Sequence, residues 1–256
     1  MNNKFGTILK IEGALLMVLA GCMVPSLLIA AAQGESSSIM GFGSVIAICV
    51  ITGFILYHRF KSQSRQSLRS RDGFLVVAAS WFIASLAGCL PFIISGSMPN
   101  FFDAFFETAS GFTTTGSTIL TDIEILPRSD LFWRSFTHWI GGMGIIVFIT
   151  AILPAFGING QIVANAETTG PTKDKIAAKF SDNSKGIYTI YFVMTLLQTL
   201  LLKLGGLTWY DSLVHTFGTV GTGGLSIYND SIAHYGSAYV EIIIALFMFL
   251  SAVNFN

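Results

Sequence analysis

The chain has 256 residues, of which 52% are hydrophobic and 11% are charged. Soluble domains carry roughly 25% charged residues, so this composition excludes an ordinary soluble protein and indicates a membrane protein. The 14 basic and 14 acidic residues cancel to a formal net charge of zero, which gives no indication of a nucleic-acid partner.

Six apolar stretches are long enough to span a bilayer, which takes about 20 helical residues with a range of roughly 17–25. In chain order they are Gly13–Ala32, Met40–Tyr57, Gly73–Ser95, Leu131–Pro154, Gly186–Leu202 and Ala238–Asn256. The first lacks a clear small-residue cleavage site and further spans follow it, so we expect a retained helix rather than a secretory signal. The fifth is the shortest, and Lys203 can extend it by reaching the membrane surface.

These spans predict an all-α membrane protein with an N-terminal helical hairpin, residues 1–58, and two pore-loop repeats, residues 73–154 and 186–256. Each repeat has the order membrane helix, re-entrant pore helix, membrane helix. Two polar segments, 59–72 and 155–185, separate these parts. The basic segment 59–72 either lies on anionic lipid headgroups or forms a solvated loop.

The basic residues predict the orientation of the chain. Eleven of the 14 fall in the N-terminus and in segments 59–72 and 155–185. Cytoplasmic loops of membrane proteins carry such an excess of Lys and Arg. We therefore expect the N-terminus and both segments on the cytoplasmic side.

A short apolar helix followed by a Thr/Gly-rich turn occurs twice, at Phe101–Thr118 and Trp209–Ser226. The apolar parts, Phe101–Phe112 and Trp209–Val220, have 12 residues each. That length is too short for a span, so we expect two re-entrant helices. The negative end of each helix dipole would then point toward a cation in the turn.

Both turns have the composition of an ion-selectivity filter. Thr and Gly expose backbone carbonyls at close range, and a potassium ion that loses its water needs such oxygen ligands. Gly also permits positive φ angles at little cost. The predicted potassium-binding residues are Thr113, Thr114, Thr115 and Gly116 in the first turn and Gly221, Thr222, Gly223 and Gly224 in the second.

The register of the second turn has two interpretations. An offset of 108 residues pairs Gly116 with Gly224 and also aligns Asp103 with Asp211. The sequence TVGTG at 219–223 instead resembles the TVGYG filter of potassium channels, which makes Gly221 the key glycine. We favour Gly224 because the first alignment keeps the acidic residues in step.

Two further residues are candidate pore-lining positions. Gly142 belongs to a run of small residues that would let helices approach closely or widen a pore beneath the filter. Asn254 is a polar residue at the matching place in the second repeat, where it would face a protein interior or an inner cavity rather than lipid.

The remaining polar residues in apolar surroundings have simple structural explanations. Arg134 and Glu241 lie near outer ends of spans, where long side chains reach water. Glu107 and His215 occupy equivalent places on the pore helices and are expected to form buried hydrogen bonds to a neighbouring repeat. His138 and His215 lack a third metal ligand, and no catalytic or nucleotide-binding motif is present, so we expect neither an enzyme nor a cofactor. The three cysteines are expected to be buried and unpaired: Cys22, Cys49 and Cys89.

The segments FFETASGFTTTGST, FWRSFTHWIGGMGIIVF, FGTVGTGGLS and AVNF together resemble the TrkH branch of the Trk/Ktr/HKT superfamily of potassium transporters. The resemblance covers nearly the whole chain. It implies four joined repeats around one pore, an N-terminal hairpin, and one glycine that marks each filter position, here Gly116 and Gly224. It also implies potassium uptake, as a cation transporter or symporter, across the bacterial inner membrane.

The chain departs from this family pattern because it carries two repeats. We therefore expect the N-terminal half of a translocating subunit, completed by the second half or by a second copy in a homodimer. A cytoplasmic nucleotide-binding TrkA-like ring is the expected regulatory partner, and K⁺ is the expected substrate. The alternative is an inactive truncated membrane protein without transport activity.

Overall fold

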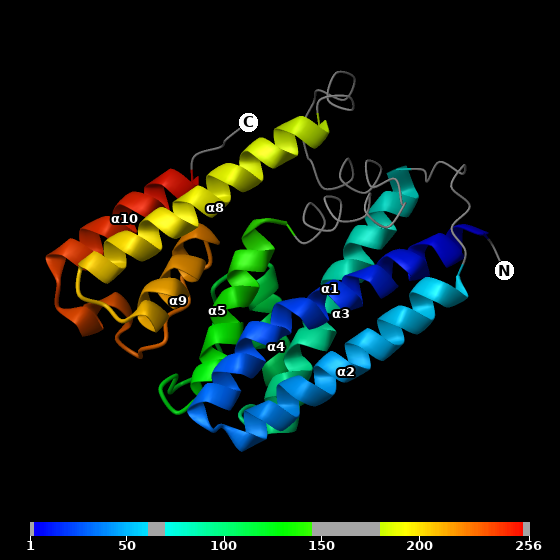
Figure 1. Cartoon of the computed structure of the whole chain (residues 1–256), viewed down its shortest axis with the longest axis horizontal. Helices are drawn as coiled ribbons and strands as arrows, with labels where there is room; N and C mark the ends of the chain where they lie inside the picture. The colour runs from blue at the N-terminus through cyan, green and yellow to red at the C-terminus, as the bar shows by residue number, and fades with distance from the viewer. Residues whose placement is uncertain (1–2, 61–69, 145–179, 253–256) are drawn as a thin grey trace.

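The structure is a computed structural model that describes residues 3–60, 70–144 and 180–252. Every regular element within these ranges is helical (Figure 1). The α-helices are α1 (Asn3–Gln33), α2 (Ser36–Arg59), α3 (Ser70–Ser95), α4 (Phe101–Phe112), α5 (Arg128–Gly142), α8 (Phe180–Leu204), α9 (Trp209–Val220) and α10 (Ala238–Ala252). A short 3₁₀ helix, η2 (Ser231–Tyr235), precedes α10.

Three helices have the length and composition of membrane spans: Phe5–Gln33, Ser36–Arg59 and Gly73–Ser95. They correspond to the first three predicted spans. The apolar parts of α8 and α10, Tyr188–Leu204 and Ala238–Ala252, are shorter. The expected segment 155–185 lies almost entirely outside the described residues, as does most of 59–72.

The fourth expected span, Leu131–Pro154, differs in the structure. Helix α5 begins at Arg128, directly after Pro127, and ends at Gly142. Gly144 then has a φ of 66°, which ends the α-helical path. Residues 145–154 lie outside the described part of the chain.

Helices α1 and α2 form the predicted hairpin through close backbone contact. A Cβ atom on Gly13 would lie 2.8 Å from the carbonyl oxygen of Gly53, and one on Gly53 would lie 2.6 Å from that of Gly13. Small residues allow membrane helices to approach this closely. The hairpin also packs on the first repeat, because α1 contacts α3 and α5.

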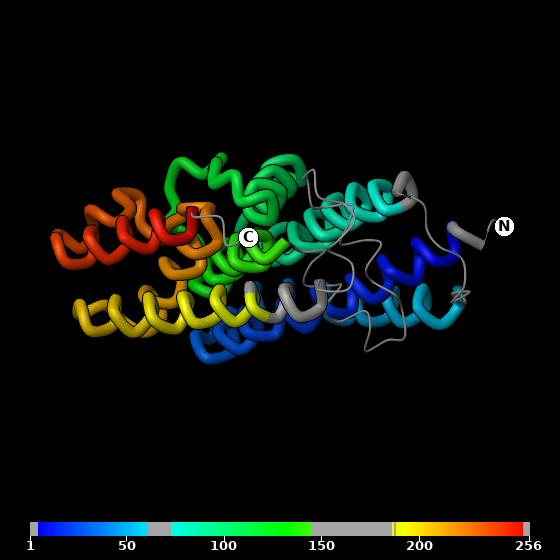
Figure 2. The backbone as a smooth tube through the Cα atoms, turned by 90° about the horizontal axis from the view of Figure 1, so that it is seen from above, coloured from blue at the N-terminus to red at the C-terminus, as the bar shows by residue number. Residues whose placement is uncertain are grey.

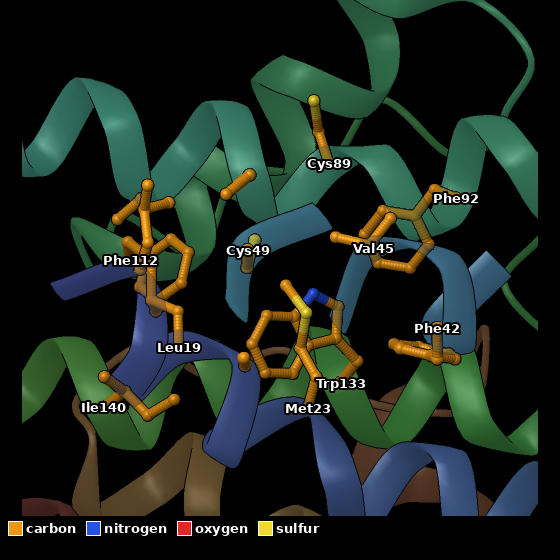
Figure 3. Packing of buried hydrophobic residues seen from close by; sticks show 14 of the residues in the cluster. Leu19, Met23, Phe42, Val45, Cys49, Cys89, Phe92, Phe112, Trp133 and Ile140 are labelled. Carbon is orange, nitrogen blue, oxygen red and sulfur yellow. The ribbon is translucent and has the colours of Figure 1, made fainter. Parts of the chain in front are cut away.

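The main core is formed by side chains of α1 to α5 around Trp133, with Val214 and Phe217 of α9 packed into the same cluster (Figure 3). The indole Nε1 donates a hydrogen bond to the carbonyl oxygen of Gly88, 2.9 Å away. The rings of Phe42 and Phe112 meet the indole edge-on, at centroid distances of 6.4 and 6.2 Å. Cys49 and Cys89 are buried and Cys22 is half-buried, all as free thiols.

Helices α8, α9 and α10 lie at one end of the long axis of the molecule, as both views show (Figures 1 and 2). One connection to the first repeat is the contact between α9 and α5. Phe217 of α9 packs there against Phe132, Phe136 and Trp139, with centroid distances between 5.0 and 5.7 Å. Helix α5 therefore lies between the two pore helices.

Candidate functional site

The two short helices have the bounds that the sequence predicts, Phe101–Phe112 and Trp209–Val220. Each begins at a side-chain cap. Asn100 Oδ1 accepts from the backbone N–H of Phe102, and Thr208 Oγ1 accepts from that of Asp211. Such caps fix the first turn of a helix and explain why both start at the same place in their repeats.

The turns that follow the two helices have the same backbone hydrogen bonds at an offset of 108 residues. Three N–H groups after the C-terminal end of each helix donate to carbonyls of its last turn. In the first turn the N–H groups of Thr113, Thr114 and Thr115 donate to the carbonyls of Ala109, Gly111 and Ser110. In the second turn those of Gly221, Thr222 and Gly223 donate to Phe217, Thr219 and Gly218.

The φ angles repeat at the same offset. Thr114 and Thr222 have φ of 54° and 60°, and Gly116 and Gly224 have 73° and 77°. A β-branched residue in the left-handed region is a genuine outlier, so the two threonines mark a constrained turn. Gly221 has φ of −71° and caps α9. The geometry of the turns thus follows the register that pairs Gly116 with Gly224.

The two turns lie against each other. A Cβ atom on Gly116 would overlap the carbonyl oxygen of Gly223, whereas one on Gly224 would meet no atom within 4 Å. The repeats therefore share the backbone conformation but differ in their surroundings. Of the eight predicted filter residues, seven are at least partly exposed, and Gly221 is buried against α5.

Of the two candidate pore-lining residues, Gly142 lies where α5 crosses α9 and α8. A Cβ atom there would be 2.7 Å from the Tyr191 hydroxyl and 2.8 Å from the Cα of Gly221. Gly142 thus allows α5 to pack closely on α8 and α9. It is also exposed on one side. Asn254 lies outside the described residues.

Helix α5 holds both turns through its buried face. Gly141 is in backbone contact with Phe112, at the end of the first pore helix. The ring of His138 fills the space beside Gly223 in the second turn, so that a Cβ on Gly223 would overlap it. His138 is fully buried, and neither ring nitrogen has a hydrogen-bond partner among the described residues.

The sequence position of Arg134 predicts a side chain that reaches water, and this prediction is wrong. Arg134 is 2% exposed and is paired with Glu107. Its Nε donates to Glu107 Oε1. The second carboxylate oxygen accepts from Thr118 Oγ1 and from the N–H of Ile119, both at 3.1 Å. Glu107 thus has its partners within its own repeat, rather than in the neighbouring one.

The equivalent place in the second repeat has a neutral contact. His215 Nε2 lies 3.0 Å from the hydroxyl of Tyr235 in η2. Tyr235 is outside the spans, and burial raises the pKa of its phenol above the ordinary value. The expected hydrogen bond of His215 therefore exists, but its partner belongs to the same repeat.

Carboxylate contacts connect loops that are distant in the sequence at two places. Glu35, at the tip between α1 and α2, accepts from the N–H groups of Arg128 and Ser129 and from the Ser129 hydroxyl. It therefore caps α5, whose own N-cap residue, Pro127, forms no side-chain cap. In the loops that follow the two turns, Asn229 Nδ2 donates to Asp122 Oδ1 at 2.9 Å.

A cavity of about 500 Å³ adjoins the second turn. It lies between α9, η2 and α10. Its lining from α10 consists of Ile244, Met248 and Ala252, and the turn contributes residues 222–225. No group of three or more His, Cys, Asp or Glu side chains that could hold a metal occurs in the described ranges.

Comparison with known proteins identifies relatives over almost the whole chain. The sequence model of the TrkH family, described as a cation transport protein, matches residues 38–256. The Trk system potassium uptake protein TrkH of Halomonas elongata is 38% identical over 97% of this chain. The Escherichia coli protein of the same name is 36% identical over 98%.

A solved structure gives the same result for the fold. The crystal structure of the potassium transporter TrkH from Vibrio parahaemolyticus covers 100% of this chain at 33% identity, with a TM-score of 0.80. This chain covers 51% of that structure and 52% of the two curated relatives, so it spans about half their length. With an all-helical fold, apolar spans and a family match over most of its length, the chain belongs to the TrkH family of membrane cation transport proteins.

Proposed function

We propose that this chain takes part in potassium uptake through a channel-like selectivity filter, as part of a TrkH-like translocating subunit. The observation that carries the proposal is the pair of turns with matching hydrogen bonds and matching φ angles. Turns of this kind present backbone carbonyls to an ion without a side chain in the way. The names of the relatives, which describe potassium uptake, support the choice of cation.

The filter residues in this proposal are residues 113–116 and 221–224. Gly116 and Gly224 take the special position in each turn, because both have positive φ and both directly follow the three residues whose N–H groups form the matching hydrogen bonds. The pore helices α4 and α9 point their C-terminal ends at the turns, and the negative end of a helix dipole favours a cation. K⁺ itself is the substrate, and no organic cofactor is needed.

A completing partner forms part of the proposal. Helices α5 and α10 both have 15 residues, and an offset of 110 relates Arg128–Gly142 to Ala238–Ala252. At this offset Arg134, His138 and Gly142 of α5, which face the second turn, correspond to Ile244, Met248 and Ala252. These three residues line the 500 Å³ cavity. We infer that a further turn, from a second half or a second copy, occupies this face.

The proposed location is the bacterial inner membrane, with the N-terminus in the cytoplasm, where a TrkA-like nucleotide-binding ring would regulate transport. The distribution of basic residues supports this orientation. The ring is proposed from the family resemblance.

Growth in low potassium tests the proposed function. Cells that lack their own potassium uptake systems would express the chain from its native coding region. The proposed second half or second copy is then present as well. We expect growth at low external K⁺ and uptake of Rb⁺ as a tracer. A strain that carries the double variant Gly116→Pro/Gly224→Pro is the control, since Pro cannot adopt positive φ. Absence of uptake by the native protein would support the alternative of an inactive membrane protein.

A further inference from the structure

Glu107 and Arg134 form a buried ion pair with contacts on both turns. Their exposures are 1% and 2%. A buried ion pair is favourable only when other hydrogen bonds satisfy its remaining polar atoms. Glu107 meets this condition at the first turn, through Thr118 and Ile119.

Arg134 extends the network to the second turn. Its Nη1 donates to the carbonyl oxygen of Ser226 over 2.9 Å. Ser226 is separated from Arg134 by 92 positions in the sequence and directly follows the second turn. The ion pair therefore joins the segments that directly follow the two turns. A single pair of residues thus connects the two repeats.

The described residues of the second repeat have no such pair at the equivalent positions. His215 stands at the position of Glu107, at the offset of 108, and Ile244 stands at the position of Arg134, at the helix offset of 110. At these equivalent positions the first repeat thus has an ion pair and the second has none. The turns also meet at Gly116 and Gly223, and Asn229 joins the loops that follow them, but the ion pair is the contact with both partners buried. Arg134 Nη2 has no hydrogen-bond partner in the described ranges, so no further contact from this atom replaces the others.

We propose that Glu107 and Arg134 are positioning residues that set the distance between the two turns and thereby the discrimination between K⁺ and Na⁺. The inference rests on the proposed filter function. Carbonyl ligands select an ion through their number and placement, so a pair that holds two groups of carbonyls at one distance determines selectivity without touching the ion.

Ion uptake by Glu107→Gln, Arg134→Gln and Arg134→Lys tests the proposal. Each variant is expressed from the native coding region in potassium-uptake-deficient cells. Lys keeps the charge but lacks the planar fork that reaches Glu107 and Ser226 together. We expect the K⁺/Na⁺ uptake ratio to fall by about tenfold in all three variants, because each loses a hydrogen bond of a charged group.

The ratio separates positioning from a merely structural role. Loss of stability alone lowers the amount of protein and reduces the uptake of both ions together. The double variant Glu107→Gln/Arg134→Gln is expected to show the same ratio as the single variants, since all remove one shared contact. Glu241→Gln, at an exposed position of α10, is the matched control and keeps the native ratio.

A distance measurement provides a readout that needs no transport. Spin labels at the exposed residues Ile119 and Asp230 report the separation of the outer loops after the two turns. We expect a broader or shifted distance distribution in Glu107→Gln and Arg134→Lys, and a native distribution in Glu241→Gln. An unchanged distribution together with an unchanged ion ratio overturns the proposal. If the native protein transports no ion, the proposed function fails, and the distance distribution alone decides whether the pair positions the turns.

Discussion

Gly116 and Gly224 have the same backbone conformation but different surroundings, which leads to unequal effects of substitution. Both φ angles are positive, so any side chain adds strain of about 1–2 kcal/mol. At Gly116 a Cβ would also overlap the carbonyl oxygen of Gly223, whereas Gly224 has open space around it. We therefore expect Gly116→Ala to reduce potassium uptake more strongly than Gly224→Ala.

Uptake of K⁺ and Na⁺, normalised to protein amount, measures this difference. Gly236→Ala is the control, because Gly236 also has positive φ and open space but lies after η2, away from the turns. It should lose stability comparably to Gly224→Ala and keep the native ion ratio. Equal uptake by Gly116→Ala and Gly224→Ala would contradict the close contact between the turns.

The residue scale also shows where sequence reasoning reached its limit. The register of the second turn followed from the alignment of Asp103 with Asp211, which is local information. The burial of Arg134 could not be predicted from such local information, because its partner Glu107 lies 27 positions away on another helix. A charged residue near the end of an apolar stretch normally reaches water, and only a complementary charge on a facing helix identifies a buried pair. The opposite charges on α4 and α5 were the available signal.

At the scale of elements, Glu35 joins the hairpin tip to the start of α5. Removing the carboxylate leaves the first N–H groups of α5 without this cap. We expect Glu35→Ala to lower the stability of the purified protein by about 1 kcal/mol, the usual cost of losing a helix cap. Glu35→Gln keeps one acceptor oxygen and should lose less.

Thermal unfolding in detergent, followed by circular dichroism, compares these variants. Glu241→Gln again serves as the control, because its side chain is exposed on α10. A melting temperature of Glu35→Ala equal to the native value would show that the cap contributes nothing measurable to α5.

Helix bounds were predictable where the sequence carries both a length limit and end signals. The pore helices have 12 apolar residues, a cap residue before them and a Thr/Gly turn after them, so their bounds agreed with the prediction. Helix α5 was predicted to begin at Leu131 because apolarity was the criterion. It begins three residues earlier, since Pro127 precedes its first turn and Glu35 accepts from Arg128 and Ser129.

At the scale of the whole molecule, the orientation of the chain can be measured directly. Single cysteines at Gln66 and Asn229 would be labelled in intact cells with a reagent that does not cross membranes, on a background without the native cysteines. We expect labelling of position 229 from outside and of position 66 only after the membrane is permeabilised, as the basic residues predict. Labelling of position 66 in intact cells would refute this orientation.

The cavity beside α10 predicts how the molecule is completed. Met248 lines the cavity, whereas its neighbour Phe249 is 70% exposed and does not. If a further turn occupies this face, Met248→Trp fills its place and weakens the association of the chain with its second half or second copy by about tenfold. Phe249→Trp should leave the association unchanged. Mass photometry of protein in nanodiscs compares the two, and a purified monomer that still conducts potassium would disprove the need for a partner.

The cap on α5 also bears on the order in which the protein is made. The ribosome adds Glu35 to the chain 93 positions before Arg128, so the hairpin can insert into the bilayer before the first turn of α5 emerges. The N-terminal hairpin can thus serve as a template during synthesis. Glu35 binds the start of α5 and fixes its depth in the membrane, and α5 then packs against the second turn. Biogenesis of the pore would begin, on this view, at a residue that never contacts an ion.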